Sequence, residues 1–303
     1  MSNTAKKDVQ TPEVCDYTGS TYRADFWEGK GREYEDAVER IAIRSLLPKE
    51  GRRYIDFGAG FGRLINEAAN YEQVVVMDYS LTMLQDAQSR LGRSDRYIYV
   101  AADLYRLPFA PNTFDVALMC RVIHHLADAP LVLKQIRASM TSGATFVLEY
   151  ANKRNLKAIL RYLLRKQEWS PFSEEPIEFV KLNFDFHPQY MSHALKAAGF
   201  TTVRQYPVSW LRLGIFKKLL PLNVMVLLDR LLQQVGRIAP VSPSIFTQNR
   251  VPGDRGMVAP VDSIFKCPQC GGAVERQDEA MVCVSEGKRW AIRDGIYDFK
   301  EPI

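Results

Sequence analysis

A glycine-rich turn between Tyr54 and Leu64 constrains the fold of this chain more than any other segment. It reads as an apolar strand, a turn with glycines at positions 58, 60 and 62, and the start of a helix. Closely spaced glycines let backbone amides approach a ligand, and the amino end of a helix favours a negative group. A dinucleotide fingerprint would need its third glycine at Arg63 and does not call for an acid at Asp56. The segment therefore predicts a nucleotide-like ligand bound by a different motif.

Strand and helix signals alternate after this turn. Ser80 is placed to cap a helix that carries Leu81, Leu84 and Ala87. Short apolar runs have the composition of strands buried in a parallel sheet, at 74–77, 97–100, 114–119 and 143–149. Together with the strand before the glycine turn, these runs predict βαβ units, a parallel sheet and right-handed crossovers.

Two further acids stand where parallel strands end. Asp78 follows the second strand, about 20 residues after Asp56, and at this offset an acid meets the ribose hydroxyls of a bound nucleoside. Asp103 follows the third strand and precedes Leu104. Aspartate is common at strand ends, but three acids, each at the carboxyl end of a successive strand in one βαβ series, indicate a binding site.

Taken in order, these features resemble class I S-adenosylmethionine (SAM) methyltransferases. The Asp-x-Gly-x-Gly-x-Gly run from Asp56 to Gly62 is similar to the first motif of that family. The resemblance covers roughly residues 20–250 and extends to the type 11 group, which includes ubiquinone and menaquinone biosynthesis methyltransferases. It implies a doubly wound, Rossmann-like α/β fold whose seven-stranded sheet ends with strands at 201–208 and 244–251. SAM is the cofactor that it implies.

The resemblance also assigns residues to the cofactor. It implies that the glycine turn holds the methionine end of SAM, Asp78 the ribose, and Asp103 with Leu104 the adenine. The full implied set is Asp56, Gly58, Ala59, Gly60, Gly62, Asp78, Tyr79, Asp103, Leu104 and Cys120. The aromatic segment Tyr22–Trp27 is expected to fold over the cofactor or to cover an apolar face of the sheet, ahead of a helix at about 32–47.

Candidate catalytic residues follow the fourth strand. Position 120 and the residues after it flank the transferring methyl in the fold that the resemblance implies, so Arg121, His124 and His125 are the candidates for acceptor contact. Methyl transfer from a sulfonium is an in-line displacement, in which the protein mainly aligns the reactants and excludes water. A base is needed only for a hydroxyl or acidic-carbon acceptor. The alternative is that a histidine here only braces the next helix, and Glu149 and Tyr150 are equally near.

The region after the fifth strand is expected to set acceptor specificity. Helices are predicted at 156–166 and 187–199, the second terminated by Gly199. An apolar helical insertion follows at about 211–238, and its uncharged run of about ten residues is half of the roughly 20 needed to cross a bilayer. It is expected to pack on the sheet, to line a pocket for an apolar acceptor, or to lie on a membrane surface.

The last forty residues are expected to form a separate unit. Residues 1–252 would form the methyltransferase domain, 253–262 a linker and 263–303 a module that resembles the small zinc-ribbon activator of tRNA, rRNA and release-factor methyltransferases. Structural zinc takes four ligands, whereas the module has three cysteines, Cys267, Cys270 and Cys283. Glu286 stands where a fourth cysteine would be. Because a degenerate ribbon held by its own small core is the alternative, no firmly bound zinc is expected.

Composition narrows the partner classes. The 303 residues carry a formal charge of +5, which falls short of the basic face of a dedicated nucleic-acid binder. An odd number of cysteines, five, suits a reducing cytoplasm. The polar segment 1–20 does not resemble a signal peptide, so a cytoplasmic location is expected.

Three functional hypotheses remain. The first is a SAM-dependent methyltransferase for an apolar small-molecule or lipid-like acceptor. The second is an RNA- or protein-modifying methyltransferase with its activator fused in cis, in which basic residues track phosphates, namely Lys153, Arg154, Lys157, Arg161, Arg165 and Lys166. A solvated helix face explains these basic residues more simply. The third is a SAM-fold scaffold without catalysis, against which the intact acids and glycines count.

Overall fold

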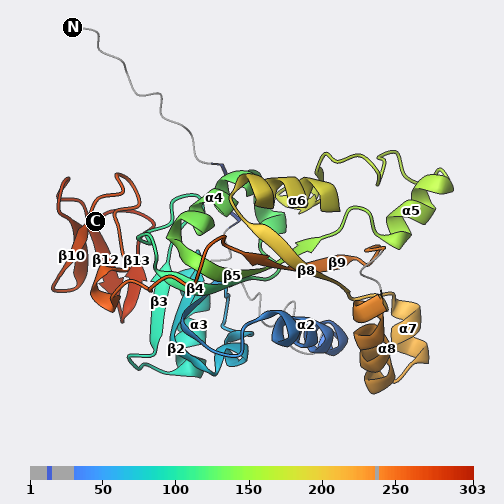
Figure 1. Ribbon diagram of the computed structural model, residues 1–303, viewed down its shortest axis with the longest axis horizontal. Helices are drawn as coiled ribbons and strands as arrows, with labels where there is room; N and C mark the ends of the chain where they lie inside the picture. Colours follow the sequence, from blue (N-terminus) through green and yellow to red (C-terminus); the bar gives the residue numbers. More distant parts are fainter. Residues whose placement is uncertain (1–11, 16–30, 236–238) are drawn as a thin grey trace, which may run out of the picture.

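The computed structural model describes residues 12–15, 31–235 and 239–303, and the aromatic segment Tyr22–Trp27 lies outside them. In sequence order, the main strands of the predicted methyltransferase region are β1 (Gly51–Phe57), β2 (Tyr71–Asp78), β3 (Tyr97–Ala101), β4 (Phe114–Met119), β5 (Met140–Ala151), β8 (Thr201–Val208) and β9 (Ser244–Arg250). They form one sheet in the order β3-β2-β1-β4-β5-β9-β8 (Figure 1). β1 to β5 pair in parallel, and β9 runs antiparallel to both β5 and β8. The predicted seven-stranded, doubly wound sheet is therefore confirmed.

Helices cover both faces of this sheet. On one face lie α2 (Glu33–Leu46), α3 (Leu81–Leu91) and α8 (Leu222–Val235), and on the other lie α4 (Ala129–Ser139) and α6 (Pro188–Ala197) (Figure 1). Alternate side chains of β2 enter the two cores: Val74 and Val76 pack on the first side, Val75 and Met77 on the second. Burial on both faces explains why this strand is continuously apolar. The Ser80 hydroxyl accepts the Met83 N–H and caps α3, as its position predicts.

The glycine turn does not open an α-helix, and here the sequence-based expectation is wrong. The turn is followed by the 3-10 helix η1 (Ile65–Ala68). Gly62 takes a φ of +76°, outside the helical region, so regular helix cannot begin before it. Gly58 is also left-handed, at +75°, and a Cβ there would lie 2.3 Å from a methyl carbon of Val122. The turn therefore offers close backbone packing and no helix dipole.

The segment between β5 and β9 contains elements that the sequence did not indicate. After α5 (Leu156–Leu163) comes a two-stranded hairpin of β6 (Ile177–Val180) and β7 (Asn183–Asp185). Lys153 is buried beside the loop that leads into this hairpin, and its ammonium donates to the carbonyls of Ser173 and Glu175. Lys153 therefore cannot belong to a surface track of basic residues.

The apolar insertion forms two helices, α7 (Gly214–Leu219) and α8, separated at Pro221. One side of α8 packs on α2 through a buried polar network in which the Asp229 carboxylate accepts the Tyr34 hydroxyl and the Gln233 amide, the latter at 3.0 Å. Leucines on its other side stay exposed. Core packing therefore explains only half of this insertion. No helix among the described residues is long and apolar enough to span a bilayer.

The carboxy-terminal ribbon extends the main sheet. Its strands are β10 (Val274–Gln277), β11 (Ala280–Cys283), β12 (Arg289–Arg293) and β13 (Ile296–Asp298), and the last pairs in parallel with β3 (Figure 1). The Phe265 ring packs against those of Phe109, Tyr297 and Phe299, with centroids 4.8–6.0 Å apart. The preceding segment, with the 3-10 helix η3 (Val261–Ser263), runs against the sheet through backbone bonds such as Gly256 N–H to the Ser142 carbonyl. An eleven-stranded sheet results.

Candidate active site

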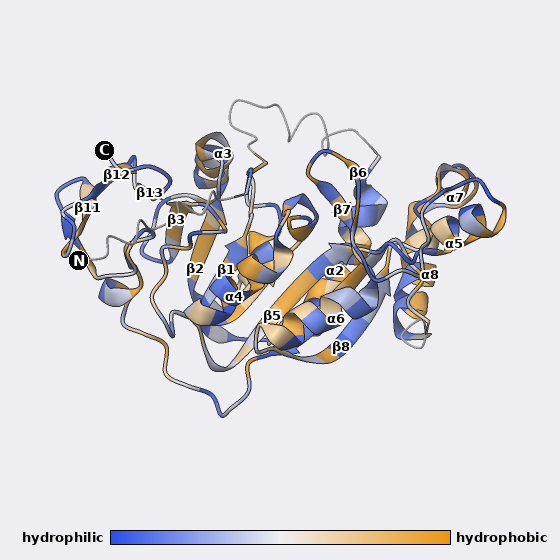
Figure 2. Cartoon of the chain, turned by 90° about the horizontal axis from the view of Figure 1, so that it is seen from above, coloured by the Kyte–Doolittle hydropathy of each residue, from blue (hydrophilic) through white to orange (hydrophobic). Residues whose placement is uncertain are grey.

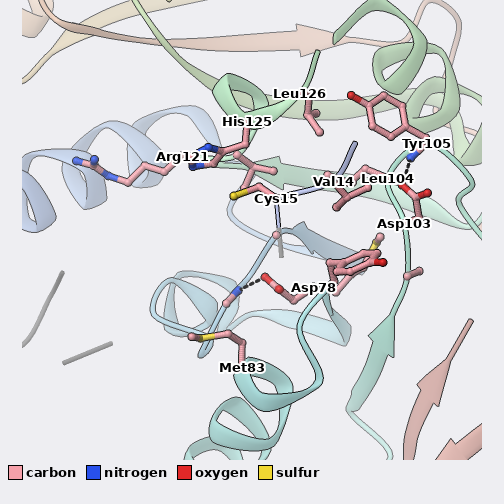
Figure 3. Close-up of a pocket in the computed structure, with 16 residues that line it drawn as sticks. Val14, Cys15, Asp78, Met83, Asp103, Leu104, Tyr105, Arg121, His125 and Leu126 are labelled. Carbon is pink, nitrogen blue, oxygen red and sulfur yellow. Dashed lines mark hydrogen bonds between the residues drawn. The ribbon is translucent and has the colours of Figure 1, made fainter. Parts of the chain in front are cut away.

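A cavity opens where the carboxyl ends of β1 to β4 meet, which is where open α/β sheets bind ligands. Together with the open space at its mouth it measures about 770 Å³. Figure 3 shows its walls converging from several loops. They include Gly58, Gly60, Met77, Asp78, Tyr79, Met83, Asp103, Leu104, Tyr105, Arg121, Val122, His125 and Leu126. Val14 and Cys15 also line it, and nothing in the sequence marked these two residues.

Asp78 connects the glycine turn to α3. One of its carboxylate oxygens accepts the Gly60 N–H at 2.8 Å, and the other accepts the Ser80 N–H at 2.9 Å (Figure 3 draws the first bond). Asp103 is held in a similar way, since its carboxylate accepts the Tyr105 N–H at 2.8 Å. Both acids are therefore oriented by their own loops before any ligand arrives.

A smaller hollow behind the turn contains the other predicted cofactor residues. It is lined by Asp56, Ala59, Arg63 and Cys120, together with the turn itself. Burial raises the pKa of Asp56 to about 7; the Arg63 guanidinium opposes this shift and the Asp78 carboxylate adds to it. Burial likewise raises the pKa of the Cys120 thiol, so this side chain is neutral. Gly62 lines neither space, and its Cβ position faces Leu91 at 3.1 Å. Its role is to shape the turn.

A second large cavity begins at Arg121 and His125, which also line the first one. With its mouth it measures about 1120 Å³. Its walls come from the 3-10 helix η2 (Ile123–His125), from the ends of β5 and β9, and from the β6–β7 hairpin. They are Arg32, Arg121, His124, His125, Glu149, Ala151, Phe179, Asn183, Phe184, Asp185, Arg212, Pro243 and Ser244. The two cavities therefore share as a common wall two of the residues that the sequence singled out for acceptor contact, Arg121 and His125.

Both histidines are neutral at physiological pH. Burial lowers the pKa of His124 well below its ordinary value, helped by the neighbouring His125 and Arg121. Burial also lowers the pKa of His125, whose Nδ1 lies 2.9 Å from the carbonyl oxygen of Leu182. Because a carbonyl only accepts, Nδ1 carries the proton and Nε2 the lone pair. The ring centroids are 4.1 Å apart. His124 Nδ1 is buried without a hydrogen-bond partner among the described residues.

Arg121 and Glu149 form a rigid brace under these histidines. The Glu149 carboxylate accepts the Arg121 N–H at 2.8 Å and the Ser244 hydroxyl, while the Arg121 guanidinium pairs with Glu39. Arg121 also has a φ of +61°, an uncommon backbone conformation that this network stabilises. Tyr150 is buried in the core and lines neither cavity. Of the two residues at this strand end, only Glu149 reaches the site.

Asp185 and Arg212 line the second cavity and were not found from the sequence. Burial raises the pKa of Asp185 to about 6, and the Arg212 guanidinium opposes this shift. Asp185 ends β7, a strand of three residues that has no periodicity to recognise. Only the folding of the hairpin over β5 brings it to the site.

Comparison with known proteins agrees with this geometry. Residues 55–148 match the family described as Methyltransferase domain. The chain therefore contains a methyltransferase domain.

Relatives of the methyltransferase domain differ in their acceptors. The chain is 31% identical over 105 residues to a malonyl-[acyl-carrier protein] O-methyltransferase of Legionella pneumophila, covering 34% of this chain and 36% of that protein. It is 34% identical over 119 residues to a demethylmenaquinone methyltransferase of Corynebacterium kroppenstedtii, covering 38% and 50%. The chain spans 36–51% of the length of three such relatives and 69% of the length of another, a demethylmenaquinone methyltransferase of Clavibacter sepedonicus.

A solved structure shares the fold of the methyltransferase domain. It is a chain of the complex that contains the Haloferax volcanii Trm112 methyltransferase activator, with a TM-score of 0.52 and 17% identity. The alignment covers 77% of this chain and 97% of that chain. At this identity the likeness shows the fold alone.

The residues at the first cavity fit SAM. Asp78 would offer a carboxylate to a ribose diol, and Met77, Leu104 and Leu126 would offer apolar walls to a purine ring. The buried Asp56 carboxylate suits the ammonium group at the methionine end, because a neighbouring cation offsets the cost of ionising it. Bound SAM supplies an electrophilic methyl group on its sulfonium.

The three cysteines of the ribbon gather with Glu286. The sulfur atoms of Cys267, Cys270 and Cys283 and a Glu286 oxygen all lie within 4.8 Å of one another. Two backbone amides donate to these sulfurs, Cys270 N–H to Cys267 at 3.3 Å and Gly272 N–H to Cys270 at 3.4 Å. Four such atoms around one point fit a tetrahedral zinc ion. With Glu286 counted, four candidate donor atoms gather where the sequence offered three cysteines.

Proposed function

We propose that the protein transfers a methyl group from SAM to an amphipathic small-molecule or lipid-like acceptor. The observation that supports this is the junction of two cavities at Arg121 and His125. One cavity fits SAM, and the other is large enough for a second molecule. A methyl donor and an acceptor in these spaces would face each other across the junction, as an in-line displacement requires.

The lining of the second cavity indicates the kind of acceptor. Asp185 and Arg212 suit a polar group near the junction, whereas Phe179 and Phe184 suit an apolar body. His125 is neutral because burial lowers its pKa, and a neutral imidazole is chemically able to take a proton from a hydroxyl or an acidic carbon. Arg121, held by Glu39 and Glu149, keeps the junction rigid. The protein thus aligns the acceptor, receives its proton and excludes water.

A calorimetric titration with SAM and its demethylated product tests the cofactor assignment. Wild-type protein should bind both, and Asp78→Ala should lose binding, because the ribose contact and the anchor of the Gly60 amide disappear together. An unchanged affinity in this variant would contradict the assignment. Because Asp78 is only partly buried, the variant should fold, and its circular dichroism spectrum checks this. No binding by the wild-type chain would favour the non-catalytic scaffold.

Methyl uptake into different cell extracts distinguishes a lipid-like acceptor from an RNA or protein acceptor. Label from methyl-labelled SAM should enter a lipid extract and not bulk RNA or protein.

The second candidate function is an RNA- or protein-modifying enzyme with its activator fused in cis. The contacts of the ribbon support it: β13 pairs with β3, and the Lys300 ammonium lies 5.0 Å from the ring centroid of Tyr79, a cavity residue. Label in RNA or protein alone would favour that candidate.

A further inference from the structure

An apolar stripe on α5 faces away from the protein. Leu156, Leu160 and Leu163 follow one another at helical spacing and share a face, and they are 51%, 50% and 65% exposed. Ala158, on the opposite side, is the buried residue of this helix. An ordinary surface helix buries its apolar stripe against the core. In α5 the apolar stripe faces solvent instead.

Basic side chains border this stripe. Lys157 and Arg161 lie one turn apart beside the leucines, and Arg165 and Lys166 continue past the end of the helix. No acidic residue occurs between Arg154 and Gln167. The exposed apolar face is therefore bordered by positive charge along the helix, and the first acid after it is Glu168, which lines the same surface hollow as Arg165 and Lys166.

The insertion helices α7 and α8 also combine exposed apolar side chains with basic residues, at the same end of the molecule. Both views place α5, α7 and α8 at the end remote from the ribbon, and Figure 1 shows α5 above and α7 and α8 below it at that end (Figures 1 and 2). Figure 2 shows hydrophobic and hydrophilic segments mixed on these helices. The exposed apolar side chains there include Ile215, Leu219, Leu227 and Leu231, and exposed Lys218 and Arg230 lie among them. Asp229, the acid in this stretch, is buried.

We propose that this end of the molecule, α5 with α7 and α8, binds the surface of an anionic lipid membrane. The leucine stripe would enter the boundary between headgroups and acyl chains, and the basic residues would contact the negative headgroups. Charge decides between occupants. A second copy of the chain would bring two basic rims together, which is unfavourable, and nucleic acid would leave the leucines in water.

Membrane docking would place the second cavity close to its supply of acceptor. Phe179 on the β6–β7 hairpin and Arg212 just before α7 line that cavity and belong to neighbouring segments. A lipid-like acceptor would then pass from the bilayer to the site without crossing water. This last step rests on the proposed function, whereas membrane binding itself does not.

Vesicle flotation with the full chain tests the proposal. The wild-type protein should float with vesicles of phosphatidylcholine and phosphatidylglycerol, and much less with phosphatidylcholine alone. Leu160→Glu combined with Leu163→Glu should weaken binding about tenfold or more, and so should Lys157→Gln combined with Arg161→Gln. The matched control combines Val203→Glu with Met257→Glu, two exposed apolar residues outside these helices, and should bind like the wild type.

Each contrary result overturns the proposal. The proposal is wrong if the wild-type protein does not float with anionic vesicles. It is also wrong if the leucine variant, the basic-residue variant and the control variant all float as well as the wild type. A dimer in analytical ultracentrifugation that Leu160→Glu with Leu163→Glu dissolves, without vesicle binding, would assign the surface to a second copy. All substituted side chains are exposed, so equal melting temperatures verify that the variants are folded. Vesicle binding without methyl transfer would reject the proposed function and leave this inference standing.

Discussion

Asp56 is a buried acid whose protonation makes the stability of the fold depend on pH. Its pKa is raised from an ordinary value of 3.8 to about 7 because burial penalises the carboxylate. Between these values the folded protein holds a proton that the unfolded chain has released. The stability contributed by this group therefore falls as the pH rises from about 4 to 7.

Asp56→Asn should remove this pH dependence. At about pH 8 the variant should be more stable than the wild type by about 1 kcal/mol or more, and the difference should vanish near pH 4. Urea unfolding across this pH range measures it, and parallel curves would contradict the prediction. SAM should bind the variant more weakly, and SAM binding to the wild type near pH 7 should release a proton, seen by calorimetry in buffers of different ionisation enthalpy.

His125 should matter for the rate more than for SAM affinity. His125→Gln keeps a side chain of similar length but removes the base, so methyl uptake should fall about 100-fold for a hydroxyl or acidic-carbon acceptor. The dissociation constant for SAM, measured by calorimetry, should hardly change. Because the pKa of His125 is lowered, the wild-type rate should stay level near neutral pH and fall only below the ordinary imidazole value of 6.5. An equal loss in SAM binding would assign His125 to the cofactor instead.

At the scale of single elements, the ribbon should bind one zinc ion per chain. The donor set consists of Cys267, Cys270, Cys283 and Glu286. Elemental analysis of the purified protein should show zinc, and Cys283→Ser should lose it. Glu286→Ala should weaken binding by roughly 10-fold or more, and Glu286→Cys should retain the metal, since both carboxylate and thiolate are zinc ligands. Zinc-free wild-type protein would instead support a ribbon held by its own core.

At the scale of the whole molecule, the ribbon should stabilise the methyltransferase domain. Truncation after Gly253 would unpair the edge of β3 and expose Phe109, which packs against Phe265. The melting temperature should fall by roughly 5–10 °C. Truncation after Lys300 is the control, because it removes only three exposed residues and should leave the melting temperature unchanged. A truncated chain with unchanged melting and activity would show that residues 1–252 are independent.

The sequence by itself determined the local elements and the order of the binding motifs. Strand burial, the Ser80 cap, and the acids Asp56, Asp78 and Asp103 all depend on residues near one another in the chain, so periodicity and spacing were sufficient to predict them. The spacing of Glu286 from Cys283 also marked it in the sequence as standing in for a fourth cysteine. Only the tertiary structure placed Asp185 and Arg212 in the same cavity as His125, since that placement depends on the folding of the β6–β7 hairpin and of the segment before α7. The same holds for α5: amphipathic periodicity shows that a helix has an apolar face, whereas the packing of Ala158 decides that this face meets solvent.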